Sequence, residues 1–118
     1  MPKIKVPNEI IRLAKKAIDE NNSLPISQRA SYKQEGDKKV PGTGMRTARR
    51  LASGAVDRQQ LELMRAWFAR HGESIKEKEA RKDKTSKAAR AWMLWGGSPG
   101  MRWVRSVLRE MEREDKKK

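Results

Sequence analysis

The clearest pattern of hydrophobic and polar positions lies near the N-terminus. Apolar residues recur there at the spacing of a helical turn, with charged residues between them, so that they form a single apolar stripe. These positions are Ile10, Ile11, Ala14, Ala17 and Ile18. Asn8 suits the cap of the first turn, while Asn21, Asn22 and Pro25 suit the end of the helix. The pattern predicts a helix over residues 8–22.

The next stretch, residues 26–44, has few apolar positions. Residues 26–35 favour a weak second helix capped by Ser27, although Ile26, Ala30 and Tyr32 offer little to bury. Residues 36–44, with the sequence GDKKVPGTG, combine turn residues with lysines. They predict a basic, solvent-facing loop of the kind that becomes ordered on a partner.

Residues 45–71 have the pattern of two helices joined by a tight turn. Met45, Ala48, Leu51 and Ala52 form the apolar edge of the first, and Gly54 provides the left-handed residue that ends it. Asp57, loosely matched to a capping box by Gln60, begins the second. Its apolar face holds Leu61, Met64, Phe68 and His71, with Leu63 and Trp67 on a flank. We expect this helical hairpin to be the centre of the fold.

The rest of the chain alternates between charged and tryptophan-rich segments. Residues 73–85 are densely charged, which indicates a solvated helix extension or a mobile linker. Residues 86–113 predict a second helical hairpin, with Ser86 starting one helix and the Ser98-Pro99 pair starting the other. Residues 114–118 form a charged tail.

No segment alternates at the period of two that a half-buried strand requires. The sequence therefore predicts an all-α fold, a compact bundle of about five helices with charged, partly mobile loops and tail. All 118 residues are expected to form this single helical domain.

Composition narrows the possible functions. The chain has 118 residues, a formal net charge of +14 and no cysteine, and His71 is its single histidine. Disulfides, zinc ribbons and sites with several histidines are therefore excluded, and no metal or other cofactor is expected. No apolar stretch approaches the length that crosses a bilayer, and the N-terminus lacks a signal-peptide pattern. These features predict a soluble intracellular binding protein without a membrane partner.

Two features are candidates for chemistry, and neither is strong. His71 has no recognisable nucleophile and no predictably placed titratable partner, so we interpret it as a packing residue rather than a general base. The sequence PGTG at residues 41–44 precedes a helix and suits a contact to a nucleic-acid phosphate. It lacks the ending of a P-loop and follows no predicted strand, so it is poor support for nucleotide hydrolysis. We expect the protein not to be an enzyme.

Positive charge is the stronger signal, because it recurs on the polar faces of predicted helices. Arg46, Arg49 and Arg50 share one face beside the lysine loop, while three further arginines line the last helix. The predicted nucleic-acid-binding residues are Lys38, Lys39, Arg46, Arg49, Arg50, Arg102, Arg105 and Arg109. Such stripes predict salt-sensitive binding that tolerates different sequences. The alternative is a cationic surface that serves only solubility.

Four tryptophans allow two interpretations. Exposed indoles beside arginine would suit base stacking on single-stranded nucleic acid. However, Trp92, Trp95 and Trp103 flank the predicted turn at residues 96–99, where rings from two helices can close a small core. We favour the core interpretation.

About half the chain resembles a known pattern. The segments PGTGMRTARRLASGAVDRQQLELMRAWFARHG and AWMLWGGSPGMRWV resemble a small domain recurrent in tailed-bacteriophage proteins. That domain has a glycine-flanked arginine helix ending in Leu-Ala/Ser-x-Gly, a helix closing on Phe-x-Arg-His, then Ala-Trp-x-Leu-Trp-Gly-Gly and a later Trp. The matching positions are Gly44, Arg46, Ala48, Leu51, Gly54, Met64, Phe68, Arg70, His71, Ala91, Trp92, Leu94, Trp95, Gly96, Gly97, Gly100 and Trp103.

The chain departs from this pattern in two places. It has Ser98-Pro99 where an acidic residue and a small residue are usual, and it carries its own N-terminal helix. The resemblance implies a phage origin and association with head-assembly or DNA-processing proteins, but no catalytic residue carries over. Together with the charge, it suggests a phage protein that binds nucleic acid, and DNA is the expected form. The alternative is a virion structural or head-assembly protein whose basic face contacts capsid, portal or packaged DNA. The expected location is the cytoplasm of the infected bacterium or the virion, and no oligomeric state follows from the pattern.

Overall fold

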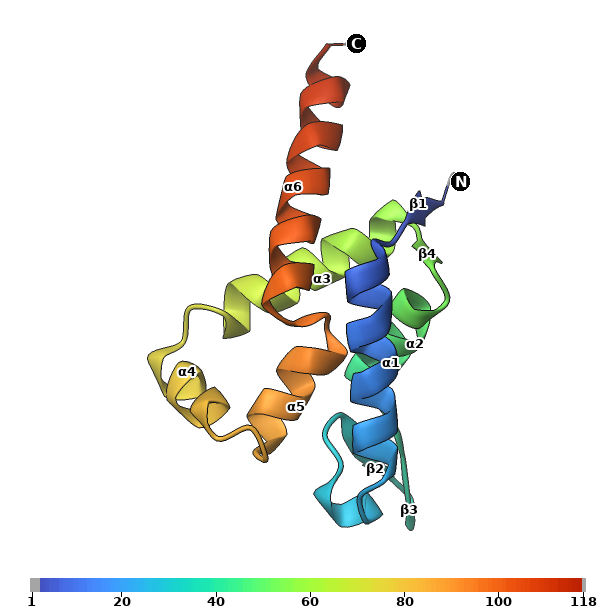
Figure 1. Ribbon diagram of the computed structural model, residues 1–118, viewed down its shortest axis with the longest axis vertical. Coiled ribbons are helices and arrows are strands. Elements are labelled where there is room, and N and C mark those ends of the chain that lie inside the picture. Colours follow the sequence, from blue (N-terminus) through green and yellow to red (C-terminus); the bar gives the residue numbers. More distant parts are fainter. Residues whose placement is uncertain (1–2, 118) are drawn as a thin grey trace.

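A computed structural model describes residues 3–117 and shows a mainly α-helical fold with two small antiparallel strand pairs (Figure 1). The helices are α1 (Asn8–Asn22), α2 (Thr43–Ala52), α3 (Arg58–His71), α4 (Ile75–Lys82), α5 (Lys87–Leu94), α6 (Gly97–Lys116) and the 3-10 turn η1 (Ile26–Gln28). The strands are β1 (Ile4–Lys5), β2 (Tyr32–Glu35), β3 (Lys38–Pro41) and β4 (Ala55–Val56). Strand β1 pairs with β4, and β2 pairs with β3.

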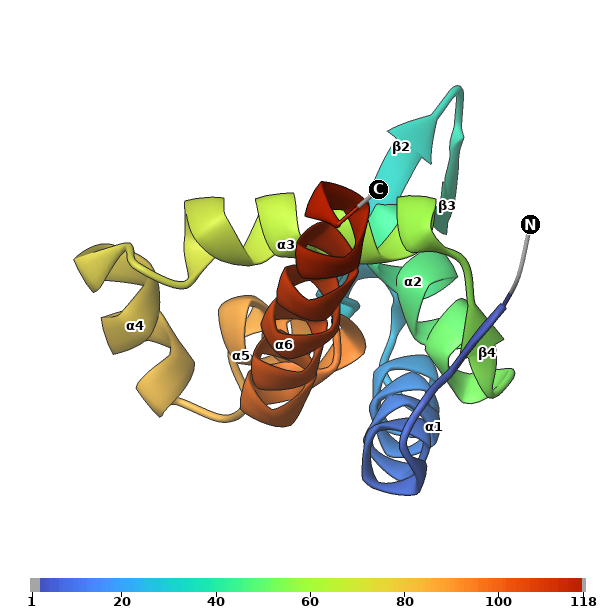
Figure 2. The ribbon, with the colours of Figure 1, turned by 90° about the horizontal axis from the view of Figure 1, so that it is seen from above.

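The helices pack around a shared core. Seen from above, α6 crosses over α3, the hairpin β2–β3 projects on one side of α3, and α1, α2 and α5 lie on the other side (Figure 2). Helix α1 packs against α2, α5 and α6, and α3 packs chiefly against α6. The short helix α4 packs against α5 at the edge of the molecule.

A continuous apolar core fills the space between the helices. Its large buried side chains come from most of the helices and include Ile10, Leu51, Phe68, Trp95 and Leu108. A smaller cluster around Met45, Ala48 and Leu94 lies where α1, α2 and α5 meet. Burial of these apolar surfaces is the main stabilising contribution to the fold.

Several sequence predictions are confirmed. Helix α1 has the predicted bounds of 8–22. The carboxylate of Asp57 accepts a hydrogen bond from the Gln60 N–H, and the hydroxyl of Ser86 accepts one from the Ala89 N–H, so both residues cap their helices as predicted. Gly54 follows α2 with a φ of 97°, in the region that favours glycine.

Three predicted helix starts or caps are wrong. The N-cap of α1 is Pro7 rather than Asn8, and it makes no side-chain hydrogen bond; instead, its carbonyl accepts from the Ile10 and Ile11 amides. Gln60 does not complete a capping box, because its amide donates to the hydroxyl of Thr47. Helix α6 begins at Gly97, one residue before Ser98.

The prediction of an all-α fold is also wrong in part. The predicted helix at 26–35 is the short turn η1 followed by β2, and the predicted loop at 36–44 contains β3 and the start of α2. The four-residue strands β2 and β3 form a hairpin in which Lys33 faces Val40 and Glu35 faces Lys38. Both strands are largely exposed, so no alternation of buried and exposed residues marked them in the sequence.

The charged segments are more helical than predicted. Residues 75–82 form a separate helix, α4, rather than an extension of α3 or a linker without structure. The hydroxyl of Ser74 caps α4 by accepting from the Glu77 N–H. Helix α6 continues through Lys116, so most of the predicted tail is helical, and residue 118 lies outside the described residues.

The two helices of the predicted hairpin over 45–71 contribute fully buried core residues, including Leu51 and Phe68, but they do not pack chiefly on each other. Helices α2 and α3 follow each other in the chain, but α2 packs chiefly against α1 and α3 against α6. Among the described residues, no helix is long and apolar enough to cross a membrane.

Candidate nucleic-acid interface

The eight predicted binding residues fall into two groups. Lys38 and Lys39 lie on β3, and Arg46, Arg49 and Arg50 lie on α2; we call these five residues the α2 basic surface. Arg102, Arg105 and Arg109 lie on α6, and we call them the α6 basic surface. The two groups lie on separate helices, because α2 packs chiefly against α1 whereas α6 packs chiefly against α3.

The α2 basic surface follows from the pattern of α2. Met45, Ala48 and Leu51 are fully buried, which turns the arginines on the opposite side of the helix outward. The Arg46 guanidinium donates to the Pro41 carbonyl at 3.3 Å, which connects the helix to the strand that carries Lys38 and Lys39.

Arg49 and Arg50 differ in how they are held. The Arg50 guanidinium donates to the side-chain oxygen of Gln60 at 2.6 Å, which fixes Arg50 against α3. Arg49 is exposed and makes no hydrogen bond within residues 3–117, so its guanidinium keeps all its donors available.

The α6 basic surface arises in the same way. Val104 and Leu108 are fully buried, which leaves Arg102 and Arg109 exposed and Arg105 half-buried on another side of the helix. Arg113 lies one turn after Arg109, but it is paired with Glu110 at 2.9 Å.

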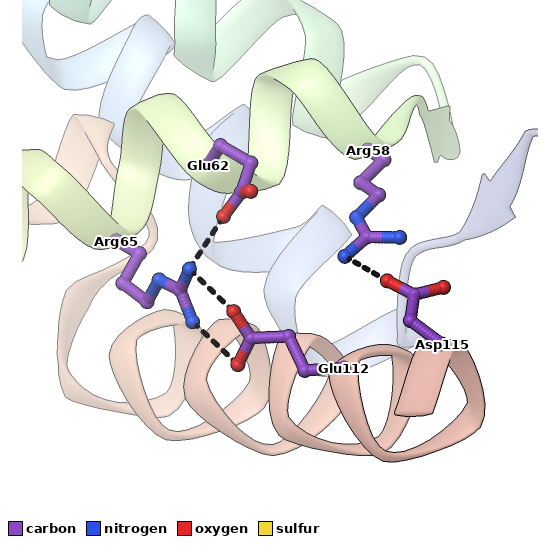
Figure 3. Close-up of polar contacts among 5 residues, drawn as sticks. All are labelled: Arg58, Glu62, Arg65, Glu112 and Asp115. Carbon is purple, nitrogen blue, oxygen red and sulfur yellow. Dashed lines mark hydrogen bonds and ion pairs between the residues drawn. The ribbon is translucent and has the colours of Figure 1, made fainter. Parts of the chain in front are cut away.

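The acidic residues near the end of α6 are engaged by α3 (Figure 3). Arg65 donates to Glu112 at 2.9 Å and to Glu62 at 2.7 Å, and Arg58 donates to Asp115 at 2.8 Å. The hydrogen bond from Arg65 is the main reason that the pKa of Glu112 lies below its ordinary value. The carboxylates of Glu112 and Asp115 therefore hold α6 against α3 rather than neutralise the arginines nearer the start of α6.

None of the eight residues of the two basic surfaces forms an ion pair within the described part of the chain, in contrast to Arg58, Arg65 and Arg113. The reason is local composition. Residues 38–56 contain no aspartate or glutamate, and neither do residues 84–109. Positive charge on both surfaces is thus left to act on solvent and on anionic partners.

The tryptophans lie in the core, as predicted. Trp92 is 9% exposed and Trp95 is 3% exposed, and Trp103 is partly buried against the same core. The ring of Trp67 stacks on Trp95 with centroids 4.7 Å apart, and the His71 ring lies 4.6 Å from Trp67. This packing leaves little indole surface for stacked bases.

His71 has a titratable partner that the sequence analysis missed. Its Nδ1 lies 2.6 Å from a carboxylate oxygen of Glu77 on α4, and its carbonyl accepts a hydrogen bond from Arg81. The sequence made no such partner predictable, because the charged sequence of residues 73–85 does not reveal that Glu77 on α4 meets the end of α3.

The PGTG segment does follow a strand, contrary to prediction. Pro41 ends β3, Gly42 is the N-cap of α2, and the Gly42 N–H donates to the Ser31 carbonyl at 2.6 Å. A side chain at position 44 would clash with Ser31, because its Cβ would lie 2.5 Å from the Ser31 hydroxyl oxygen. Glycine at 44 therefore lets the start of α2 lie directly against Ser31.

Comparisons of the chain with protein-family models, with curated proteins and with solved structures found no match.

Proposed function

We propose that the protein binds nucleic acid, DNA in the first instance, through its phosphate backbone and without catalysis. The observation that carries the proposal is that none of the eight lysines and arginines of the two basic surfaces forms an ion pair within residues 3–117. Most of them are exposed, and they lie on stretches without acidic residues. A surface whose lysines and arginines form no ion pairs favours contact with a polyanion.

The expected mechanism is release of counterions from the phosphates. Each phosphate that a lysine or arginine neutralises lowers the log of the binding constant by about 0.9 per tenfold rise in salt. If all five residues of the α2 basic surface contact phosphates, the slope is about −4.5. The three residues of the α6 basic surface alone would give a slope of about −2.7.

Charge-reversal variants test this proposal. Arg46→Glu with Arg49→Glu should weaken binding to a fluorescent DNA duplex and flatten the salt slope, because both side chains are exposed. Arg50 is left intact, since its bond to Gln60 would make loss of folding a competing explanation. The matched control is Arg12→Glu with Lys15→Glu, which makes the same charge change on the exposed face of α1.

Equal weakening of DNA binding by the α2 pair and by the control pair would show that binding depends only on the net charge of the protein. Unchanged anisotropy titrations for the α2 pair would remove that helix from the interface. The pair Arg102→Glu with Arg109→Glu then measures the α6 basic surface in the same assay.

We further propose a bacteriophage setting, on the basis of the resemblance described above. Two roles fit the basic surfaces: DNA metabolism in the cytoplasm of the infected bacterium, or a structural or assembly role in which a basic face contacts capsid, portal or packaged DNA. Mass spectrometry of purified particles distinguishes the two roles. A fixed copy number supports the virion role, whereas presence in infected cells and absence from particles supports the DNA-metabolism role.

A further inference from the structure

A cavity of about 490 Å³ lies where the start of α2 meets the ends of α3 and α5. Residues that line it include Ser31, Thr43, Gly44, Arg70 and Trp95. We propose that this cavity binds one phosphoryl group of a nucleic-acid strand. The choice of a nucleic acid as the source of that group rests on the proposed function, whereas the argument for the anion site rests on the cavity itself.

The first contribution to the site is the N-terminus of α2, which has ten residues. Its N-cap, Gly42, has no side chain to satisfy the amides of the first turn. The Met45 N–H donates to the Ser31 hydroxyl, and the Arg46 N–H donates to the Gly42 carbonyl. The Thr43 and Gly44 amides have no acceptor among the described residues, and free amides at a helix start favour an anion.

The second contribution is the indole N–H of Trp95. Trp95 is 97% buried, yet this N–H has no hydrogen-bond partner within residues 3–117. Every fully buried side-chain nitrogen or oxygen in that range does have a partner, so the Trp95 nitrogen must reach open space. Trp95 lines this cavity, and its nitrogen lies 3.1 Å from the position that a Cβ at Gly44 would occupy. The indole nitrogen therefore lies beside the start of α2, at the cavity that Thr43 and Gly44 also line.

The charges around the cavity also favour an anion. Arg70 is exposed and makes no hydrogen bond within the described residues, while Arg81 lies over the Trp92 ring and donates to the His71 carbonyl. The one carboxylate among the lining residues, Glu77, is already hydrogen-bonded to His71. Two amides, an indole N–H and an arginine thus form a donor set that suits phosphate oxygens.

The direct test uses the full chain labelled with ¹⁵N and inorganic phosphate as the probe. We expect the largest shifts at the Thr43 and Gly44 amides and at the Trp95 indole N–H. The indole of Trp92 donates to the Ser98 hydroxyl and serves as the internal control, so it should move little. Shifts spread evenly over exposed lysines and arginines, or none at Trp95, would overturn the inference.

Variants separate the cavity from general surface charge. Arg70→Gln should weaken the affinity for inorganic phosphate about three- to tenfold, because one charge-assisted hydrogen bond at a partly exposed site is lost. The matched control Arg12→Gln removes the same charge from α1 and should leave it unchanged. Trp95→Phe keeps an aromatic ring and removes the N–H donor. If that variant does not fold, the comparison of Arg70→Gln with Arg12→Gln still decides. Equal affinity for phosphate in these two arginine variants contradicts the site.

Oligonucleotides identify the source of the phosphoryl group. Tighter binding of a strand with a 5′-phosphate than of the same strand with a 5′-hydroxyl, lost in Arg70→Gln, assigns the cavity to a strand end. Equal binding of both strands, with the Trp95 signal still shifted, assigns it to an internal phosphodiester. DNA binding that leaves the Trp95 indole signal unshifted refutes this inference but leaves the proposed function intact. Shifts of the cavity signals by phosphate, without any DNA binding, refute the proposed function alone.

Discussion

The sharpest stability prediction concerns Asn21, the buried polar side chain near the end of α1. It is 1% exposed, and its amide forms two hydrogen bonds with the backbone of Ala30. The side-chain nitrogen donates to the Ala30 carbonyl at 3.0 Å, and the side-chain oxygen accepts from the Ala30 N–H at 2.9 Å. This pair of bonds positions the backbone directly before Ser31, and hence one wall of the cavity.

We expect Asn21→Ala to lower the free energy of unfolding by about 3 kcal/mol. The substitution leaves two groups of Ala30, which is 2% exposed, without a partner, and each such buried group costs about 1 to 3 kcal/mol. For a chain of this length, a loss of that size lowers the melting temperature by about 12 °C. Urea unfolding followed by tryptophan fluorescence measures the change directly.

Two further substitutions make the result interpretable. Asn21→Leu keeps the branched shape and the number of heavy atoms of the side chain but removes the hydrogen bonds, so it should lose most of the same stability. Asn22→Ala changes an exposed asparagine next to it and should cost less than about 1 kcal/mol. A loss below about 1 kcal/mol in Asn21→Ala would refute the reasoning, because it would mean that the Ala30 groups find water or other partners without cost.

Three other outcomes follow from the contacts described above. Trp92→Ala should lower the free energy of unfolding by about 3 to 5 kcal/mol, because the ring packs in the core, and a variant that keeps its urea midpoint but loses nucleic-acid binding would instead support base stacking. His71→Gln should lower the free energy of unfolding by about 1 to 2 kcal/mol, because the bond to Glu77 and some packing are lost. DNA binding should persist in the folded protein. A hydrolase or nuclease activity that disappears in this variant would refute the absence of catalysis. Glu112 has a pKa lowered from 4.5 by Arg65, so its contribution to stability is present above about that pH and is lost as the pH falls through the lowered pKa. Glu112→Gln should therefore flatten the dependence of thermal stability on pH in the acidic range, and identical profiles for the two proteins would contradict that contribution.

The parts of the fold with strong local signals were predictable. Helix α1 has an apolar stripe at helical period, and Asp57 and Ser86 are capping residues in suitable positions, so their roles follow from the sequence. The β2–β3 hairpin was missed because both strands are mostly exposed and their residues have no alternation to detect. Local pattern predicts an element only where one of its faces is buried.

The candidate sites also differ in how far the sequence predicts them. The basic surfaces were predictable residue by residue, because charge and helical spacing can both be counted along the chain. The cavity was not, because it depends on Ser31, Gly44 and Trp95 meeting across long separations in the sequence. The PGTG segment did indicate a phosphate contact, but nothing in the sequence placed an indole N–H beside it.

The position of α1 has a consequence for the order of folding. This helix comes first in the chain, but it packs against α2, α5 and α6, the last of which spans residues 97–116. Its apolar stripe therefore lacks full cover until the C-terminal helix has left the ribosome. Contacts between segments so far apart in sequence slow folding, because the entropy of loop closure is lost before those contacts form. During synthesis, part of the apolar stripe of α1 thus stays accessible to chaperones and to aggregation until α6 is available to cover it.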